Sequence, residues 1–113
     1  RASANSFASI MYWIVRQRAV SSAASEAMLA LLERPLDPPR ADENQVKEFL
    51  GESLPPGSKL WSKAGDTSEV RHDAAYAELP DGQRLILVAL TRAGEEKTLL
   101  PVIGKHLLAE LAR

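Results

Sequence analysis

The sequence predicts an α+β fold in which helices flank an antiparallel sheet. Apolar side chains recur at helical spacing in the first fifteen residues and again near the C-terminus. Between these regions, two segments rich in strand-forming residues flank Asp81-Gly82, a dipeptide typical of β-hairpin turns. We therefore expect three strands from this chain, at residues 59–64, 69–79 and 83–91.

Composition limits the size and the class of the protein. With 113 residues, the chain is one domain or part of one. Its formal net charge of −1 gives no reason to expect nucleic acid or an anionic membrane as a partner. The absence of cysteine excludes disulfides, thiolate catalysis and cysteine-based metal sites. No apolar run reaches the roughly 20 residues of a membrane span, and nothing at the start resembles a signal peptide.

The first helix is expected to begin directly after Ser3, a residue type favoured at the N-cap. The apolar residues that follow fall on one helical stripe: Phe7, Ile10, Met11, Ile14 and Val15. Tyr12 and Trp13 lie off this stripe, and their size predicts that the helix is covered on a second side as well. We interpret these aromatic residues as core filler rather than as ligand-stacking groups.

Two further helices are expected before the strands. The second should end before Pro35, and its apolar residues are Met28, Leu29, Leu31 and Leu32. After an irregular proline-rich connector, Asp42 restarts a helix with Gln45 as its capping-box partner. Gly51 is expected to end this third helix. Its inward-facing side chains should be Val46, Phe49 and Leu50.

Turn and helix signals also surround the sheet. Pro55-Pro56-Gly57 suits a turn that leads into the first strand. From Glu95 a C-terminal helix is expected, with an inward stripe of Leu100, Ile103, Leu107 and Leu111. Because Pro101 falls inside this pattern, either the helix starts near Thr98 with proline in its first turn or it is kinked. Gly104 should permit close approach of this helix to the sheet.

The strand at residues 83–91 indicates that the sheet extends beyond this chain. Its run from Leu85 to Leu90 has no polar alternation, which is typical of strands buried on both faces. In a three-stranded meander, however, this strand would lie at an edge with unpaired backbone groups. Because residues 1–53 show no spare strand, we expect a second polypeptide to pair with strand 83–91.

The candidate chemistry centres on Lys63-Ala64-Gly65, on an extended segment just after the Pro-Pro-Gly turn. A lysine followed by a small residue and glycine can hold a cation rigidly against a cleft. Gly65 would let a substrate backbone approach closely. Two histidines far apart in the sequence, with no clustered carboxylates, do not predict a metal site, and no cofactor is expected.

Taken in order, these features resemble the C-terminal half of class A β-lactamase-type serine hydrolases, a family that includes penicillin-binding transpeptidases. The resemblance covers nearly the whole chain and rests on the first helical stripe, the Lys63-Ala64-Gly65 box, the Arg71-His72-Asp73 strand, the Asp81-Gly82 hairpin and the last helix. It implies that Lys63 is an electrostatic anchor and that Gly65 and the Asp66 backbone N–H shape the oxyanion site. Such a cation about 4 Å from an anion contributes ~4 kcal/mol at an effective dielectric near 20.

The sequence departs from the family pattern in two respects. Ala64, in the substrate-binding box, lacks the hydroxyl that family members use to hold a substrate carboxylate. The Ser-x-x-Lys nucleophile motif, the Ser-Asp-Asn loop and the deacylating acid belong to an N-terminal portion that this sequence does not contain. Ser21, Ser22 and Ser25 are not replacements, because none has lysine three residues later. This polypeptide alone should therefore be inert.

Arg71 allows two interpretations. Strand alternation places Arg71 and Asp73 on one face and His72 on the other, so only one side can look into a cleft. In the first interpretation, Arg71 binds a substrate carboxylate in place of the missing hydroxyl. In the second, Arg71 and Asp73 form a surface pair, and His72 is hydrogen-bonded under a helix.

We therefore expect a helical segment at 1–53, part of an all-helical lobe, and strands plus a helix at 54–113, part of an α/β lobe. Missing strands and helices of the N-terminal portion, as a second chain, would complete this β-lactamase-like fold. The completed enzyme would hydrolyse an amide or ester through an acyl-enzyme, with β-lactams and peptidoglycan-like peptides as candidate substrates. The alternatives are a non-catalytic module that binds a peptide or glycan, and an interaction domain that recruits partners by strand addition.

The chain begins at Arg1 without Met, which suggests a processed or excised product. The resemblance implies a periplasmic or extracellular location.

Overall fold

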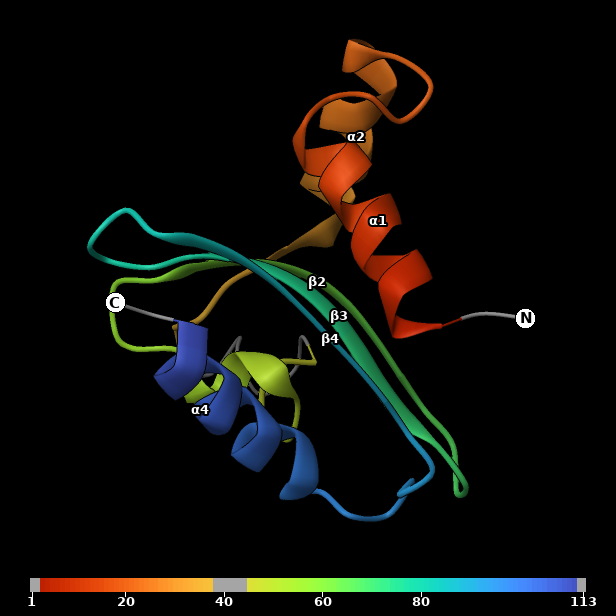
Figure 1. The fold of residues 1–113 in the computed structure, drawn as a ribbon, viewed down its shortest axis with the longest axis vertical. Helices are drawn as coiled ribbons and strands as arrows, with labels where there is room; N and C mark the ends of the chain where they lie inside the picture. The colour runs from red at the N-terminus through yellow and green to blue at the C-terminus, as the bar shows by residue number, and fades with distance from the viewer. Residues whose placement is uncertain (1–2, 38–44, 112–113) are drawn as a thin grey trace.

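The computed structural model describes residues 3–37 and 45–111, which form an α+β fold (Figure 1). Within these residues, an antiparallel sheet has the strand order β1-β2-β3-β4. The strands are β1 (Glu33–Arg34), β2 (Lys59–Asp66), β3 (Arg71–Glu78) and β4 (Arg84–Thr91). The helices are α1 (Ala4–Val15), α2 (Ser22–Leu32), the short 3-10 helix η1 (Leu50–Ser53) and α4 (Leu99–Leu111). Helix α4 and η1 lie on one side of the sheet, and α1 and α2 lie on the other.

The main hydrophobic core lies between the sheet and the layer of η1 and α4. Leu60 from β2, Leu87 from β4 and Leu100 from α4 are almost completely buried there. Leu50 from η1 joins them, together with smaller residues from all three long strands. Because successive strand residues point to opposite faces, the sheet presents one apolar surface to this core and a second surface to α1.

Local sequence signals correctly predict the start of the first helix and the end of the second. Ser3 is the N-cap of α1, and its side chain accepts a hydrogen bond from the Ser6 N–H. Ser21 caps α2 in the same way through the Ala24 N–H, and α2 ends at Leu32, before the proline. Helix α4 begins at Leu99 with Pro101 in its first turn, which is the first of the two expected alternatives.

The strand predictions hold for the three long strands but not for the strand count. The second strand begins at Arg71 rather than at residue 69, and β2 continues through Asp66. A fourth, two-residue strand, β1, lies in the segment where the sequence shows no strand. It pairs with β2 and not with β4, so in the part of the chain described here β4 forms one edge of the sheet and the short β1 lies at the other.

The expected third helix is wrong over its described part. Asp42 lies outside the described residues, but residues 45–49 form turns and bends. Gln45 and Glu48 adopt left-handed backbone angles, with φ of 60° and 71°, which an α-helix cannot contain. Gly51 consequently lies inside the 3-10 helix η1 instead of ending an α-helix. The segment still buries Val46, Phe49 and Leu50, as the sequence predicts.

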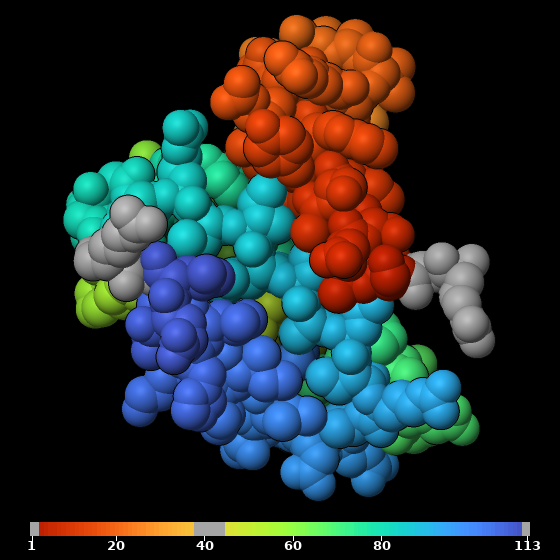
Figure 2. All heavy atoms as spheres, viewed as in Figure 1, coloured from red at the N-terminus to blue at the C-terminus, as the bar shows by residue number. Residues whose placement is uncertain are grey.

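Helix α1 is covered on one side only. Met11 and Ile14 are buried, whereas Tyr12 and Trp13 are 49% and 52% exposed. The expectation of a second covered side is therefore not met within this chain. In the space-filling view, α1 and α2 stand out from the rest of the molecule (Figure 2).

Gly104 of α4 allows a close approach, but to η1 and not to the sheet as expected. A Cβ atom at this position would lie 2.5 Å from Ser53 Oγ and 2.9 Å from the Leu50 carbonyl oxygen. The backbone oxygen cannot move away without displacing η1. Gly104 therefore sets the distance between α4 and the segment that precedes β2.

This contact reverses the usual effect of replacing a helical glycine. Gly104→Ala would gain up to ~1 kcal/mol of stability at an exposed helical position. Here we expect a loss of about 1–3 kcal/mol, because the added methyl group overpacks the contact with η1. Urea denaturation measures this difference, with exposed Lys105→Ala on the same helix as the control. A Gly104→Ala protein as stable as the original would show that the contact is not tight.

Candidate functional site

Strand β2 separates the three residues of the Lys63-Ala64-Gly65 box. Lys63 and Gly65 are exposed on the face opposite α4, whereas Ala64 is 3% exposed and belongs to the hydrophobic core. The Lys63 ammonium donates a hydrogen bond to the Ala64 carbonyl oxygen. The strand thus presents the cation and the glycine on one side, and it turns the alanine side chain away from them.

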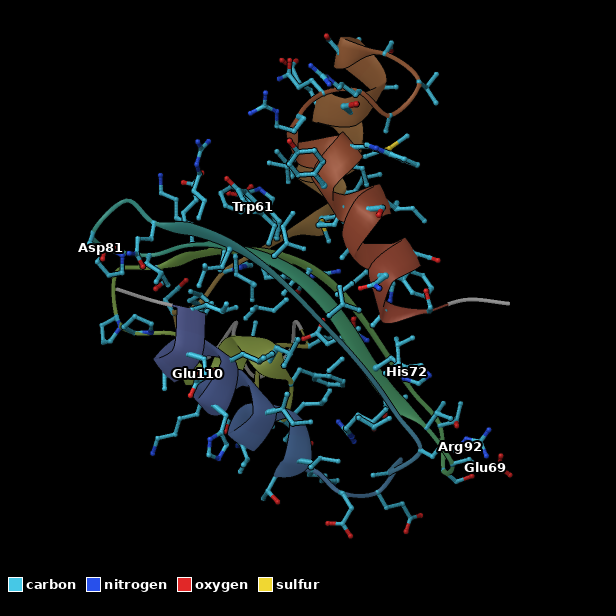
Figure 3. The ribbon with its side chains drawn as sticks, in the orientation of Figure 1. Trp61, Glu69, His72, Asp81, Arg92 and Glu110 are labelled. Atoms are coloured by element: carbon cyan, nitrogen blue, oxygen red, sulfur yellow. The ribbon has the colours of Figure 1, made fainter. Side chains whose placement is uncertain are left out.

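His72 shares the face of Lys63 and Gly65. It is the direct cross-strand partner of Gly65, and such partners project to the same side of a sheet. Figure 3 shows His72 on the side of the sheet away from α4. Its Nδ1 accepts a hydrogen bond of 3.0 Å from the Thr91 N–H, so a neutral ring carries its proton on Nε2. The half-buried imidazole can therefore present an N–H donor on this face.

The surface above Gly65 is open. A Cβ atom built on Gly65 meets no atom within 4 Å, and its φ is not left-handed. Glycine at this position is therefore not required by packing within the chain. The face formed by Lys63, Gly65 and His72 combines a cation, an N–H donor and a flat stretch of backbone that an extended ligand can approach.

Arg71 lies on the opposite, core-facing side, and it is only 4% exposed. Its Nε donates to the Gly94 carbonyl oxygen at 3.1 Å, and Nη1 donates to the Glu48 carbonyl oxygen at 3.4 Å. Its guanidinium lies 4.7 Å from the centre of the Phe49 ring and 3.5 Å from a carboxylate oxygen of Asp66. These partners occupy the guanidinium within the chain.

The expected surface pair of Arg71 and Asp73 is wrong, because both side chains are buried and Asp73 has another partner. Asp73 Oδ2 accepts a hydrogen bond of 3.0 Å from the Leu50 N–H. The role of Arg71 as an anchor for a substrate carboxylate stays a prediction, and it would require the guanidinium to exchange its present partners.

Asp66 is the last residue of β2 and the cross-strand partner of Arg71. Its side chain is 44% exposed and pairs with the Arg71 guanidinium. The turn that follows, at Thr67 and Ser68, packs against Gly94. The backbone of Asp66 thus lies next to Gly65 at the end of the exposed face, while its side chain is tied to the core-facing side.

Asp73 is a buried carboxyl that the sequence does not identify as a special group. Desolvation by burial raises its pKa to about 6, although the N–H groups of Leu50 and Ala74 and the charges of Arg34 and Lys63 oppose the shift. Its Oδ1 has no hydrogen-bond partner among the described residues, and the same is true of the buried Ser62 Oγ. The cost of burying an ionised Asp73 is therefore only partly offset by hydrogen bonds, because one of its two carboxylate oxygens has no partner in the described part of the chain.

The described residues give no indication of a metal centre. Across 3–37 and 45–111, no group of three histidine, aspartate or glutamate side chains is placed to hold an ion. No helix in these ranges is both long and apolar enough to cross a bilayer. The chemistry of the exposed face is that of a cation and hydrogen-bond donors.

Comparisons with known proteins agree with this architecture. A model of the "Beta-lactamase enzyme family" matches residues 1–112. No curated protein matches the chain significantly.

Three solved structures illustrate the likeness of fold. PBP-A is 18% identical with a TM-score of 0.74 over 92% of this chain. A β-lactamase from Sphaerobacter thermophilus is 23% identical with a TM-score of 0.63 over 91%. The chromosome-encoded β-lactamase of Vibrio parahaemolyticus is 11% identical with a TM-score of 0.76 over 99%. The chain spans only 37%, 38% and 42% of the lengths of these proteins, respectively.

The buried carboxyl makes stability depend on pH in a specific direction. Since the pKa of Asp73 rises from 3.8 to about 6 on folding, the folded state binds more protons than the unfolded state between these values. Stability from this group therefore falls as pH rises from about 4 through 6, by on the order of 3 kcal/mol in all, and levels off near pH 7. Asp73→Asn keeps an acceptor for the Leu50 N–H but cannot ionise, so it should lack this loss.

Urea denaturation across pH 4–7 tests this prediction. The difference in the free energy of unfolding between the original protein and Asp73→Asn cancels the pH dependence that comes from the other carboxylates. Asp73→Ala serves as the control. It removes the acceptor as well as the charge, so it should leave the Leu50 N–H unsatisfied at every pH. Parallel pH profiles for the original protein and Asp73→Asn would contradict the assignment.

Proposed function

Since the chain belongs to the β-lactamase enzyme family, we propose that it is the C-terminal part of a serine hydrolase that acts through an acyl-enzyme. The N-terminal portion of the fold would carry the nucleophile and its base. This chain would contribute one wall of the active site, formed by Lys63, Gly65 and the backbone of Asp66. The observation that carries the proposal is the placement of Lys63 and Gly65 on one exposed face with open space above the glycine.

In the proposed reaction, a serine Oγ of the N-terminal portion attacks the carbonyl carbon of an amide or ester. A C–O bond to serine forms, the bond to the leaving nitrogen or oxygen breaks, and the serine proton passes through a base to the leaving group. Water then attacks the acyl-enzyme and releases the acid and the free serine. The chain described here contributes no group to these proton transfers.

The contribution of this chain is electrostatic. Negative charge develops on the carbonyl oxygen as the tetrahedral intermediate forms, and the Asp66 N–H would donate to that oxyanion. One such donor typically lowers the barrier by roughly 3 kcal/mol. The Lys63 ammonium would favour the deprotonated serine and attract an anionic substrate. The attraction between this ammonium and an anion about 4 Å away is worth ~1 kcal/mol in bulk water and ~4 kcal/mol at an effective dielectric near 20. Exclusion of water from the site therefore determines how strongly Lys63 acts.

His72 adds a polar contact to the same wall. Its Nε2–H projects from the position directly across from Gly65, where the substrate would lie along β2. We assign to it a hydrogen bond to an acceptor on the substrate. Ala64 supplies no hydroxyl, and its side chain lies in the core. The polar side chains of the proposed wall near Gly65 are therefore Lys63 on β2 and His72 on β3.

The proposed partner is the N-terminal portion of the same enzyme, present as a second chain. It would pair with the free edge of β4 and cover the exposed side of α1. The exposed large apolar residues of α1 are Phe7 and Ile10, on the same stripe as the buried Met11 and Ile14, and Tyr12 and Trp13, which lie off it. The structural relatives, of which this chain spans less than half, support such a complement. A periplasmic or extracellular site of action is part of this proposal, as expected for an enzyme that acts on cell-wall peptides or β-lactams.

The absence of a hydroxyl in the box favours a second candidate function. A module that binds a peptide or glycan without turning it over would need the same face but not the nucleophile. The structure of a PBP-A mutant is of an acyl-enzyme complex with penicillin G, which supports acylation as the chemistry of this fold. Acylation therefore remains the first proposal.

Mass spectrometry with an acylating β-lactam or a fluorophosphonate tests the two functions directly. The chain assembled with its N-terminal portion should form an adduct on a serine of that portion, and the chain alone should form none. Lys63→Met should slow adduct formation by about 100-fold or more. Lys59→Met, on the same face of the same strand, should leave the rate unchanged. If no serine of the assembly is modified, the hydrolase proposal fails and the binding module is favoured.

Gly65→Ala separates substrate access from folding. The added methyl group meets nothing within the chain, so the free energy of unfolding should change by less than about 0.5 kcal/mol. In the assembly it would displace a substrate lying along β2, and a shift of about 1 Å can cost roughly 100-fold in rate. Thermal denaturation and the rate of acylation are to be measured on the same preparation. An unchanged acylation rate would mean that substrates do not pass over Gly65.

A further inference from the structure

Arg71 is a buried cation whose partners come from three separate segments of the chain. It is the first residue of β3 and lies across from Asp66 on β2 and Thr91 on β4. A charge removed from water is costly unless it is paired and hydrogen-bonded. The guanidinium meets this requirement by contacting the end of β2, the segment before η1 and the segment before α4.

The geometry of these contacts uses separate donors of the guanidinium. Nε reaches the Gly94 carbonyl oxygen, Nη1 reaches the Glu48 carbonyl oxygen, and Nη2 faces the Asp66 carboxylate. The planar guanidinium spreads these donors over three nitrogens in fixed directions, whereas the three donors of a lysine ammonium rotate on one nitrogen and cannot span the same separation. The Arg71 main chain is held too, because Thr91 Oγ1 donates to its carbonyl oxygen at 2.7 Å.

The segment around Gly94 contacts the turn after Asp66 without spare room. A Cβ atom on Gly94 would lie 2.2 Å from the Thr67 carbonyl oxygen and 2.6 Å from that of Ser68. The backbone at Gly94 is therefore packed directly on the residues that follow β2. Because Arg71 binds Gly94 on one side and Asp66 on the other, it closes a loop of contacts around the end of β2.

From these contacts we infer that Arg71 is a positioning residue, which fixes the backbone of Asp66 at the end of the substrate-binding face. This inference rests on the proposed function, in which the Asp66 N–H stabilises the oxyanion. Arg71 acts from the core side of the sheet, behind Asp66, and does not touch the substrate. Its loss would let the end of β2 move and would misalign the oxyanion donor while leaving Lys63 and Gly65 in place.

The test compares Arg71→Ala and Arg71→Lys with the original chain in the assembly with its N-terminal portion. The kcat for an anionic and for an uncharged acylating substrate should fall about tenfold to a hundredfold in both variants, with little change in KM. Guanidinium ion at millimolar concentration should restore part of the kcat of Arg71→Ala by refilling the site. It should not restore Lys63→Ala. Arg92→Ala, an exposed arginine near the same end of the sheet, should match the original protein (Figure 3).

Two other outcomes would overturn the inference. A rise in KM confined to the anionic substrate, with unchanged kcat, would instead identify Arg71 as the anchor of a substrate carboxylate. Unchanged kinetics for both substrates would exclude either role. If Arg71→Ala does not fold, Asp66→Asn removes the ion pair alone and should give a smaller fall in kcat of the same kind; unchanged kinetics in that variant would contradict the inference.

Hydrogen exchange separates this inference from the proposed function. Amides of residues 65–68 should exchange faster in Arg71→Ala than in the original protein, while those of α1 should not change. Faster exchange in an assembly that forms no acyl-enzyme would mean that Arg71 fixes the strand end but that the proposed hydrolase function is wrong. Unchanged exchange in an active assembly would overturn the positioning role alone.

Discussion

The alternation of side chains along two paired strands determines everything that this chain can present to a ligand. In β2, Lys63 and Gly65 face outward because Ala64 between them faces the core. The antiparallel register then brings His72 beside Gly65 and sends Arg71 to the opposite side. A slip of one residue in either strand would exchange these sets, burying the lysine and exposing the alanine. The apolar core and the exposed polar face are therefore specified by the same register.

The core-facing side of β3 carries charges at positions where apolar residues would cost less. Arg71 and Asp73 are both buried; Arg71 is bound to the backbone of Glu48, just before η1, and Asp73 to that of Leu50, the first residue of η1. The segment before η1 contains residues with left-handed φ angles, Gln45 and Glu48. Replacing buried charges with apolar residues is often neutral or stabilising, so stability alone does not explain these two charges, which do not pair with each other. Their directional bonds hold an irregular segment in one position against the sheet.

The sequence predicts those elements whose signals are local. Ser3 caps its helix through a side-chain hydrogen bond within one turn, and Asp81-Gly82 forms the hairpin that its composition indicates. The segment at 45–49 is mispredicted because Gln45 and Glu48, neither of them glycine, adopt left-handed φ angles, and the Glu48 carbonyl oxygen accepts a hydrogen bond from Arg71, which is distant in sequence. The partner of Gly104 is likewise η1, a tertiary contact that no periodicity encodes. Alternation correctly separates Arg71 from His72, but only the register with β2 shows which of them shares the face of Lys63.

The surfaces that this chain leaves uncovered lie on and beside that same face. Helix α1 packs against β3 and β4 there and has Met11 and Ile14 buried, yet it leaves Tyr12 and Trp13 half exposed. The free edge of β4 adjoins it, and Lys63 is open on the neighbouring part of the sheet. Covering apolar side chains and pairing a strand edge are both favourable, so a complement that does both would dock on this side. It would thereby exclude water from the vicinity of Lys63, and the lower dielectric would strengthen the interaction of the ammonium with a developing anion. In the proposed enzyme, completion of the fold and of the active site would then result from one binding event.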